Sequence, residues 1–143
     1  MIATQQGVCA VRFDPHRFAD GELGGPLAAD AAEQLRDYLD GTRTDFDLPL
    51  DWRGVKGARK GILLELLKVT FGFTASYGEL AERAGMPGAA QLVGQVLASN
   101  PIPVLVPCHR VTRSGGGLSG FAGARRAVEI KAWLLAHEGA RLL

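Results

Sequence analysis

Apolar residues recur at helical spacing along most of this chain. Between residues 26 and 40 they return every fourth position, which predicts an amphipathic helix that ends before Gly41. Similar patterns predict helices over residues 58–69, 88–98 and 124–137, and a capping box formed by Ser76 and Glu79 begins another helix that runs to about Arg83. The residues expected on the buried faces are Leu27, Ala31, Leu35 and Leu39; Ile62, Leu63, Leu66, Leu67 and Val69; Leu92, Val93, Val96 and Leu97; and Ala127, Ile130, Trp133, Leu134 and His137.

Shorter apolar runs predict strands. One covers residues 7–13 and is ended by Asp14 and Pro15, and another covers residues 102–106, broken only by Pro103, and leads to Cys108. Residues 42–51 are expected to form an extended connector anchored by apolar side chains. The expected fold class is α+β: a small, shortened N-terminal α/β annex, then a mainly helical C-terminal domain with a helix-turn-helix and a short active-site strand.

The helix-turn-helix is predicted from two short helices joined by a glycine-containing turn at residues 85–88. A plain helical hairpin in a small core has the same pattern. The second helix carries the small residues Ala89, Ala90 and Gly94. Such a helix can approach either a neighbouring helix or a nucleic-acid groove closely.

Charge divides the chain near Asp51. Residues 1–51 carry ten acidic and four basic side chains, a balance of −6, whereas residues 52–143 carry five acidic and twelve basic ones, a balance of +7. We therefore expect a boundary between an N-terminal domain, residues 1–51, and a cationic C-terminal domain, residues 52–143. The C-terminal domain either faces a polyanion or simply presents a solvated basic surface. No apolar run approaches the ~20 residues needed to span a bilayer, and the N-terminus lacks a signal pattern, so a cytoplasmic protein is expected.

Candidate chemistry centres on Cys108, His109 and Arg110. A thiol must lose its proton to act as a nucleophile, and a neighbouring base or cation can promote that loss. The alternative is packing, because cysteine is among the most buried residue types. The only other cysteine, Cys9, is expected to be a free thiol. The three histidines lack the close spacing of metal ligands, so no metal or other cofactor is expected.

Several segments together resemble the 6-O-alkylguanine-DNA alkyltransferases. The resemblance spans roughly residues 55–139, is weak over the N-terminal third, and rests on residues 75–81 (ASYGELA), 100–101 (NP), 102–111 (IPVLVPCHRV) and 133–139 (WLLAHEG), in the family's order. It implies a protein that binds duplex DNA in the minor groove through the helix-turn-helix. It further implies that the damaged guanine is rotated out of the stack and that its alkyl group moves irreversibly to a cysteine.

By motif position, the resemblance makes Cys108 the alkyl acceptor and His109 the base that takes its proton through a water. Glu138 then orients His109, Asn100 braces the turn before the strand, and Tyr77 crowds the phosphate so that the nucleotide turns outward. The implied partner is double-stranded DNA containing alkylated guanine, bound by a monomer without a cofactor. Further DNA or base contacts are expected from Gln91, Ala89, Ala90, Gly94, Arg110, Ser114, Phe121, Arg125 and Arg126.

Three features depart from the family pattern. Gln91 stands where the family places an arginine that fills the gap left by the flipped base, and Phe121 stands where a tyrosine is frequent. The loop before the last helix is longer, and Arg125 and Arg126 lie in the first helical turn, where cations are unfavourable unless a phosphate binds there. The alternative function is therefore an alkyltransferase-like protein that recognises lesions with weak or no transfer, although such proteins usually replace the cysteine. A Cys-His thiol hydrolase fits poorly, because adjacent residues of a strand point to opposite faces.

Overall fold

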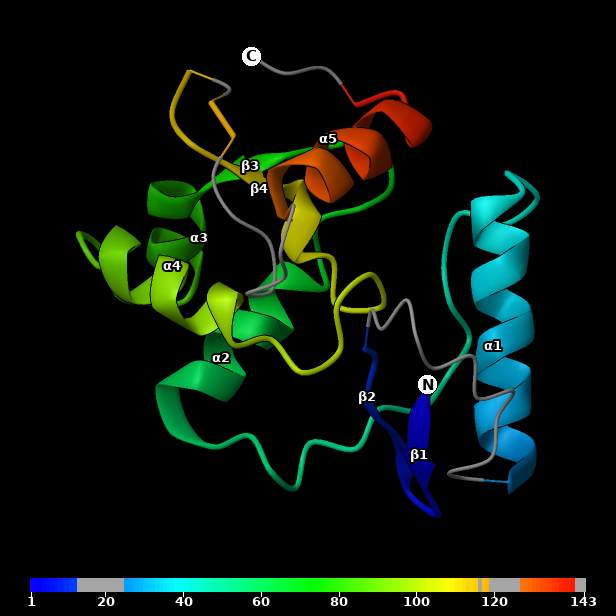
Figure 1. The fold of residues 1–143 in the computed structure, drawn as a ribbon. Helices are drawn as coiled ribbons and strands as arrows, with labels where there is room; N and C mark the ends of the chain where they lie inside the picture. The colour runs from blue at the N-terminus through cyan, green and yellow to red at the C-terminus, as the bar shows by residue number, and fades with distance from the viewer. Residues whose placement is uncertain (13–24, 116, 119–126, 141–143) are drawn as a thin grey trace.

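The structure is a computed structural model that describes residues 1–12, 25–115, 117–118 and 127–140. Its fold is α+β (Figure 1), as the sequence predicted. A two-stranded hairpin formed by residues 2–10 and the first helix, residues 25–39, lie on one side, and the other helices lie on the opposite side. The elements in chain order are β1 (Ile2–Thr4), β2 (Gly7–Ala10), α1 (Gly25–Leu39), α2 (Gly57–Leu66), β3 (Ala75–Ser76), α3 (Tyr77–Arg83), α4 (Ala90–Ala98), the 3-10 turn η1 (Cys108–Arg110), β4 (Val111–Thr112) and α5 (Ala127–His137).

The N-terminal elements form a small layer around Val8. Strands β1 and β2 pair antiparallel, and the connector joins them because the Val8 amide donates to the Pro49 carbonyl at 2.8 Å while the Asp51 amide donates to the Val8 carbonyl at 2.8 Å. Helix α1 packs against both strands. Strand β1 was not predicted from the sequence, and Phe13 lies outside the described residues.

Helix α1 buries most of the predicted face, because Ala31 is fully buried and Leu27 and Leu35 pack against the core, but Leu39 does not follow the prediction. Its buried residues are Ala28, Ala31, Gln34 and Tyr38, whereas Leu39 is 43% exposed. A residue repeat of four advances about 400° around a helix with 3.6 residues per turn, so each step drifts by about 40°. The series has therefore turned out of the core by Leu39, and Tyr38 is buried there instead.

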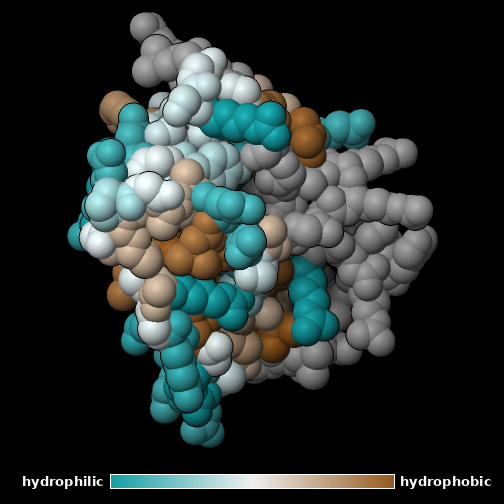
Figure 2. Space-filling view, turned by 90° about the vertical axis from the view of Figure 1, so that its left-hand side faces the viewer, coloured by the Kyte–Doolittle hydropathy of each residue, from teal (hydrophilic) through white to brown (hydrophobic). Residues whose placement is uncertain are grey.

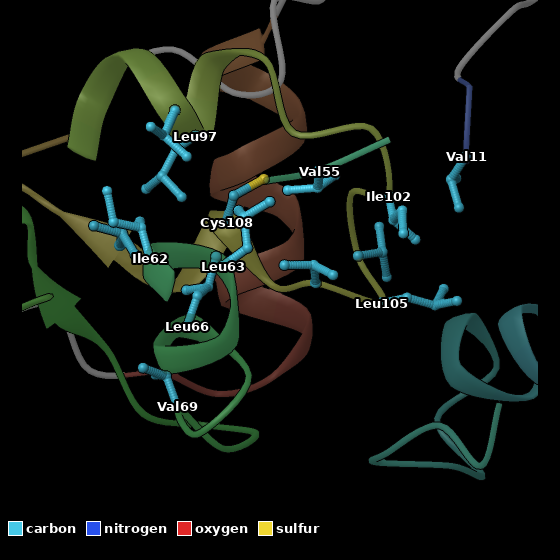
Figure 3. Close-up of a cluster of buried hydrophobic side chains, with 14 of the residues drawn as sticks. Val11, Val55, Ile62, Leu63, Leu66, Val69, Leu97, Ile102, Leu105 and Cys108 are labelled. Carbon is cyan, nitrogen blue, oxygen red and sulfur yellow. The ribbon is translucent and has the colours of Figure 1, made fainter. Parts of the chain in front are cut away.

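The C-terminal helices pack around α2. Ile62, Leu63 and Leu66 of α2 are fully buried in the hydrophobic core (Figure 3). The predicted capping box begins α3, since the Glu79 amide donates to Ser76 Oγ at 3.1 Å and the Ser76 amide donates to Glu79 Oε2 at 3.2 Å. Helix α2 ends at Leu66, three residues earlier than predicted.

Helices α3 and α4 pack against each other and are joined by a turn with positive φ at Gly85 and Gly88. Helix α4 buries Val93, Val96 and Leu97, but Leu92, which was expected to be buried, is 39% exposed.

The predicted strand before Cys108 is wrong. The Val106 amide donates to the Ile102 carbonyl at 2.9 Å, which closes a tight buried loop, and the cysteine lies in the 3-10 turn that follows. Prolines 103 and 107 explain the difference, because proline has no amide hydrogen for a strand ladder. The strand comes after the cysteine: β4 pairs parallel with β3.

Helix α5 buries Lys131, Leu134 and Leu135. Trp133 was expected on this face but is 53% exposed. Residues 124–126, where the helix was expected to start, lie outside the described residues. Among the described helices, none has both the length and the apolar character that a membrane crossing requires.

Close contact between the hairpin and the connector makes Gly7 a sensitive position. A Cβ atom there would lie 2.6 Å from the Pro49 carbonyl oxygen, so Gly7→Ala should lower the free energy of unfolding by about 1 to 3 kcal/mol. Urea denaturation monitored by circular dichroism measures the change. The matched control is Gly61→Ala inside α2, where a Cβ meets open space and should raise stability by roughly 0.5–1 kcal/mol. Equal stability of Gly7→Ala and the unaltered protein would contradict the packing described here.

Candidate active site

Cys108 is a buried thiol at the start of η1, only 4% exposed. Figure 3 draws it as part of the hydrophobic cluster that also contains Val55 and Leu63. Burial raises the pKa of the Cys108 thiol to about 11, although a hydrogen bond with Asn100 and the charge of Lys131 oppose this shift. The resting site therefore holds a protonated thiol, which needs a base before it can act as a nucleophile.

The loop before Cys108 is held in a strained conformation by Asn100. Val104 has a φ of 73°, which is unfavourable for a β-branched residue and costs on the order of 1–3 kcal/mol. The buried Asn100 side chain spans the loop: its Oδ1 accepts from the Ile102 amide at 3.0 Å, and its Nδ2 donates to the Val106 carbonyl at 2.9 Å. The predicted bracing contact is thus present, although it holds a loop rather than a strand.

His109 and Glu138 form a buried pair. His109 Nε2 lies 2.7 Å from Glu138 Oε1, and both side chains are fully buried. Burial lowers the pKa of His109 despite the partner carboxylate, because the cations Arg110 and Lys131 also disfavour an imidazolium. Burial alone would raise the pKa of Glu138, but hydrogen bonds from His109, Arg110 and Tyr38 hold it well below its usual range. A neutral imidazole with Nε2 bound to the carboxylate can accept a proton at Nδ1.

Arg110 points inward, so the expected DNA contact of this side chain is wrong. Its Nε donates to Glu138 Oε2 at 2.9 Å, its Nη2 donates to Glu138 Oε1 at 2.9 Å, and its Nη1 donates to the Val69 carbonyl at 2.7 Å. Arg110 is 7% exposed. The positive charge of Arg110 compensates the negative charge of the Glu138 carboxylate. The sequence motif alone did not indicate this role.

Tyr38 and Gly72 complete the shell around the carboxylate. The Tyr38 hydroxyl donates to Glu138 Oε1 at 2.7 Å, and the Gly72 amide donates to Oε2 at 3.3 Å. Burial and the adjacent carboxylate raise the pKa of Tyr38, so its hydroxyl remains protonated. Sequence reasoning missed Tyr38, because a contact across 100 residues leaves no local pattern.

Lys131 is the second residue that sequence reasoning missed. It is 1% exposed, donates from Nζ to the Tyr77 hydroxyl at 3.4 Å, and lies 5.6 Å from the centre of the Tyr77 ring. A signal was available, because Lys131 precedes Leu134 by three residues and Glu138 by seven, which places all three on one side of a helix. A buried cation at this position favours the thiolate form of Cys108.

The residues expected to contact DNA are only partly brought together. Gln91 is exposed on α4, Ala89 and Ala90 are half-buried, and Gly94 lies against the Tyr77 ring, where a Cβ would come within 3.9 Å. Figure 2 shows the side of the molecule on which α3 and α4 lie, with hydrophobic residues gathered between hydrophilic ones. The exposed residues of α4 are uncharged: Gln91, Leu92, Gln95 and Ala98.

The remaining predicted contacts belong to the segment before α5. Ser114 is exposed two residues after the end of β4. Phe121, Arg125 and Arg126 lie outside the described residues. This part of the predicted DNA-binding surface stays a prediction.

Comparison with known proteins identifies the family. Residues 58–140 match the family described as 6-O-methylguanine DNA methyltransferase, DNA binding domain. The methylated-DNA–protein-cysteine methyltransferase of Mycolicibacterium paratuberculosis is 44% identical over 127 residues, which cover 88% of this chain and 73% of the relative. The enzyme of the same name from Mus musculus is 54% identical over 79 residues, which cover 54% of this chain but 36% of the relative. The chain therefore belongs to the methylated-DNA–protein-cysteine methyltransferase family of DNA-repair enzymes.

Solved structures agree with this placement. The Mycobacterium tuberculosis OGT in complex with DNA has a TM-score of 0.81 and 35% identity, with 96% of this chain and 84% of that chain covered. S. pombe Atl1, in complex with damaged DNA containing O6-carboxymethylguanine, has a TM-score of 0.51 and 29% identity, with 59% of this chain and 77% of that chain covered. Both matches support the α+β fold.

The buried pair predicts acid-sensitive stability. The pKa of His109 is lower in the folded protein than its usual value near 6.5, so the unfolded chain binds the proton more tightly. The stabilising contribution is complete above that unfolded pKa and is lost as pH falls below it. Glu138, whose folded pKa is also lowered, adds a further loss below about pH 4.5.

We therefore expect the free energy of unfolding from urea denaturation to fall between pH 7 and pH 5, by at most about 1.4 kcal/mol for each pH unit below the unfolded pKa of the imidazole. His109→Gln removes the titrating group and should flatten this interval while leaving the loss below pH 4.5. Identical slopes between pH 7 and pH 5 in both proteins would show that His109 is not the group responsible.

Proposed function

We propose that this chain is a single-turnover repair protein that moves the alkyl group of 6-O-alkylguanine in duplex DNA to Sγ of Cys108. The observation that carries the proposal is the buried thiol in one 3-10 turn with His109, whose Nε2 is held 2.7 Å from Glu138 Oε1. An S–C bond forms as the C–O6 bond of the alkylguanine breaks. No other covalent partner is needed, and each molecule acts once.

Proton movement follows from the charges around the thiol. The Cys108 proton passes through a water to Nδ1 of His109, because Glu138 already engages Nε2. The leaving guanine regains a proton, so that overall the thiol hydrogen replaces the alkyl group on the base. Tyr77 is suited to hydrogen-bond the leaving base, since Lys131 donates to its hydroxyl and makes that group a better donor.

DNA recognition is assigned to α3, the turn and α4, acting as a helix-turn-helix in the minor groove. The small residues Ala89 and Ala90 begin the second helix and allow close approach, and solved relatives are described as complexes with DNA. We assign residues 1–51 to an N-terminal α/β domain and residues 52–143 to the DNA-binding alkyltransferase domain. The partner is duplex DNA containing alkylated guanine, bound by a cytoplasmic monomer.

Alkyl transfer predicts a specific covalent product. Incubation with a duplex that contains one 6-O-methylguanine should add one methyl group to the peptide containing Cys108, in an amount that never exceeds one per protein molecule. Peptide mass spectrometry measures the product. Cys9→Ser is the matched control and should transfer normally, whereas Cys108→Ser should show no gain in mass.

Two other outcomes have distinct meanings. Binding of the damaged duplex without any mass gain at Cys108 would favour the alkyltransferase-like function, in which the lesion is recognised but not repaired. Methylation of Cys9 in the Cys108→Ser protein would overturn the assignment of the acceptor.

Gln91 provides a test of how the base is extruded. The family places an arginine here, and extrusion costs a few kcal/mol that contacts in the vacated gap must offset. Gln91→Arg should tighten duplex binding several-fold, increase the salt dependence by about one charge, and speed transfer from duplex DNA. Single-turnover kinetics and binding at several salt concentrations measure these effects.

The matched control is Gln95→Arg, which adds the same charge one turn further along the exposed side of α4. If only charge matters, both variants should bind more tightly and transfer at similar rates. A faster transfer confined to Gln91→Arg would support a role in the gap, and an unchanged rate in both would show that another residue already fills it.

A further inference from the structure

We propose that Tyr38, on the N-terminal helix α1, is a positioning residue that limits the basicity of His109 by sharing the carboxylate oxygen of Glu138. The proposal deepens the proposed function, on which its kinetic consequence rests. It also makes the N-terminal part a contributor to the chemistry at Cys108.

Glu138 Oε1 accepts from donors of three residues. The Tyr38 hydroxyl lies at 2.7 Å, His109 Nε2 at 2.7 Å and Arg110 Nη2 at 2.9 Å. The tyrosine and the histidine are both fully buried, so water does not replace either contact. Electron density drawn toward one donor is less available to the others, and the tyrosine therefore weakens the bond between the carboxylate and the imidazole.

The surroundings of Tyr38 fix the direction of its hydroxyl. Its ring contacts Phe46, with ring centres 5.4 Å apart, and meets Phe71 edge to face at 6.2 Å. Its carbonyl accepts from His137 Nε2 at 2.6 Å, and the His137 ring lies edge to face against the tyrosine ring at 5.2 Å. Because His137 immediately precedes Glu138, the ends of α1 and α5 are joined at the carboxylate.

The effect on His109 has a definite sign. Loss of the Tyr38 hydroxyl leaves a more basic carboxylate, which stabilises the imidazolium form and raises the pKa of His109. The other ionisable groups around this pair are Arg110, Lys131, Cys108 and His137, and none of them is altered by that change. Tyr38 itself does not titrate in the relevant range, because burial and Glu138 raise its pKa.

A raised pKa would protonate His109 at pH values where the base must be neutral. In the proposed reaction only a neutral imidazole can receive the proton of Cys108. The tyrosine therefore extends to lower pH the range in which the relay operates. A movement of α1 away from α5 would break the hydrogen bond between Tyr38 and Glu138 without changing α3 or α4.

The test is Tyr38→Phe, which keeps the ring and removes the hydroxyl. NMR titration of the His109 imidazole in the free protein should show a midpoint on the order of half a pH unit or more higher than in the unaltered protein. The acid limb of the pH profile for methyl transfer should move upward by the same amount. Phe46→Leu is the matched control: it loosens the packing of the same ring but leaves the hydroxyl in place, so stability should fall with an unchanged His109 midpoint.

The outcomes separate this proposal from the proposed function. A Tyr38→Phe protein whose His109 midpoint does not rise overturns the proposal, whether or not transfer occurs. An equal rise in Phe46→Leu also overturns it, because packing alone would then explain the shift. Absence of methyl transfer in the unaltered protein would instead refute the proposed function, while the imidazole titration would still test the role of Tyr38.

Discussion

The cluster of hydrogen bonds around the buried carboxylate of Glu138 is the interaction on which the rest of the structure depends. The carboxylate lies just beyond the last turn of α5 and accepts hydrogen bonds from His109, Arg110, Tyr38 and the Gly72 amide. These donors come from separate parts of the chain, so one anion connects the N-terminal helix, the segment after α2 and the cysteine turn. Removal of a partner from a buried ion pair typically costs about 3–5 kcal/mol, which makes the cluster a structural constraint as well as a chemical one.

Local strain is concentrated in the loop that delivers the thiol. Val104 adopts a positive φ while fully enclosed by the core, and Asn100 bonds to both sides of it. A regular strand would satisfy its amides with a neighbouring strand, but here the Val106 amide donates to the Ile102 carbonyl and the Ile102 amide to Asn100 Oδ1. The loop therefore offers Cys108 at the start of a 3-10 turn, where successive side chains are about 120° apart rather than on opposite faces. The sequence-based argument that Cys108 and His109 point to opposite faces of a strand therefore does not hold for this geometry.

The sequence predicted features that depend on nearby residues and failed on those that depend on distant ones. The capping box of Ser76 and Glu79 was predicted correctly because both of its hydrogen bonds are local. The buried face of α1 was only partly right: Ala31 is buried as predicted, but tertiary packing buries Tyr38 in place of Leu39. Family motifs indicated that Cys108 and Glu138 belong to the same site, with Glu138 next to His109. They gave no indication that the Arg110 side chain points inward toward the same carboxylate. The Tyr38 contact spans 100 residues, and no periodicity or motif within either helix could reveal its partner.

The protonated state of the Cys108 thiol protects the sulfur from reaction with unrelated electrophiles. Burial raises the pKa of Cys108 to about 11, so the free protein exposes almost no thiolate at neutral pH. A protein that can react only once loses its function whenever an unrelated electrophile reaches the sulfur. Asn100 and Lys131 oppose the rise in pKa, and in the proposed reaction the neutral imidazole of His109 takes the proton. Under the proposed function, reaction then depends on the arrival of the alkylated nucleobase, which would link the chemistry of the thiol to the binding of damaged DNA.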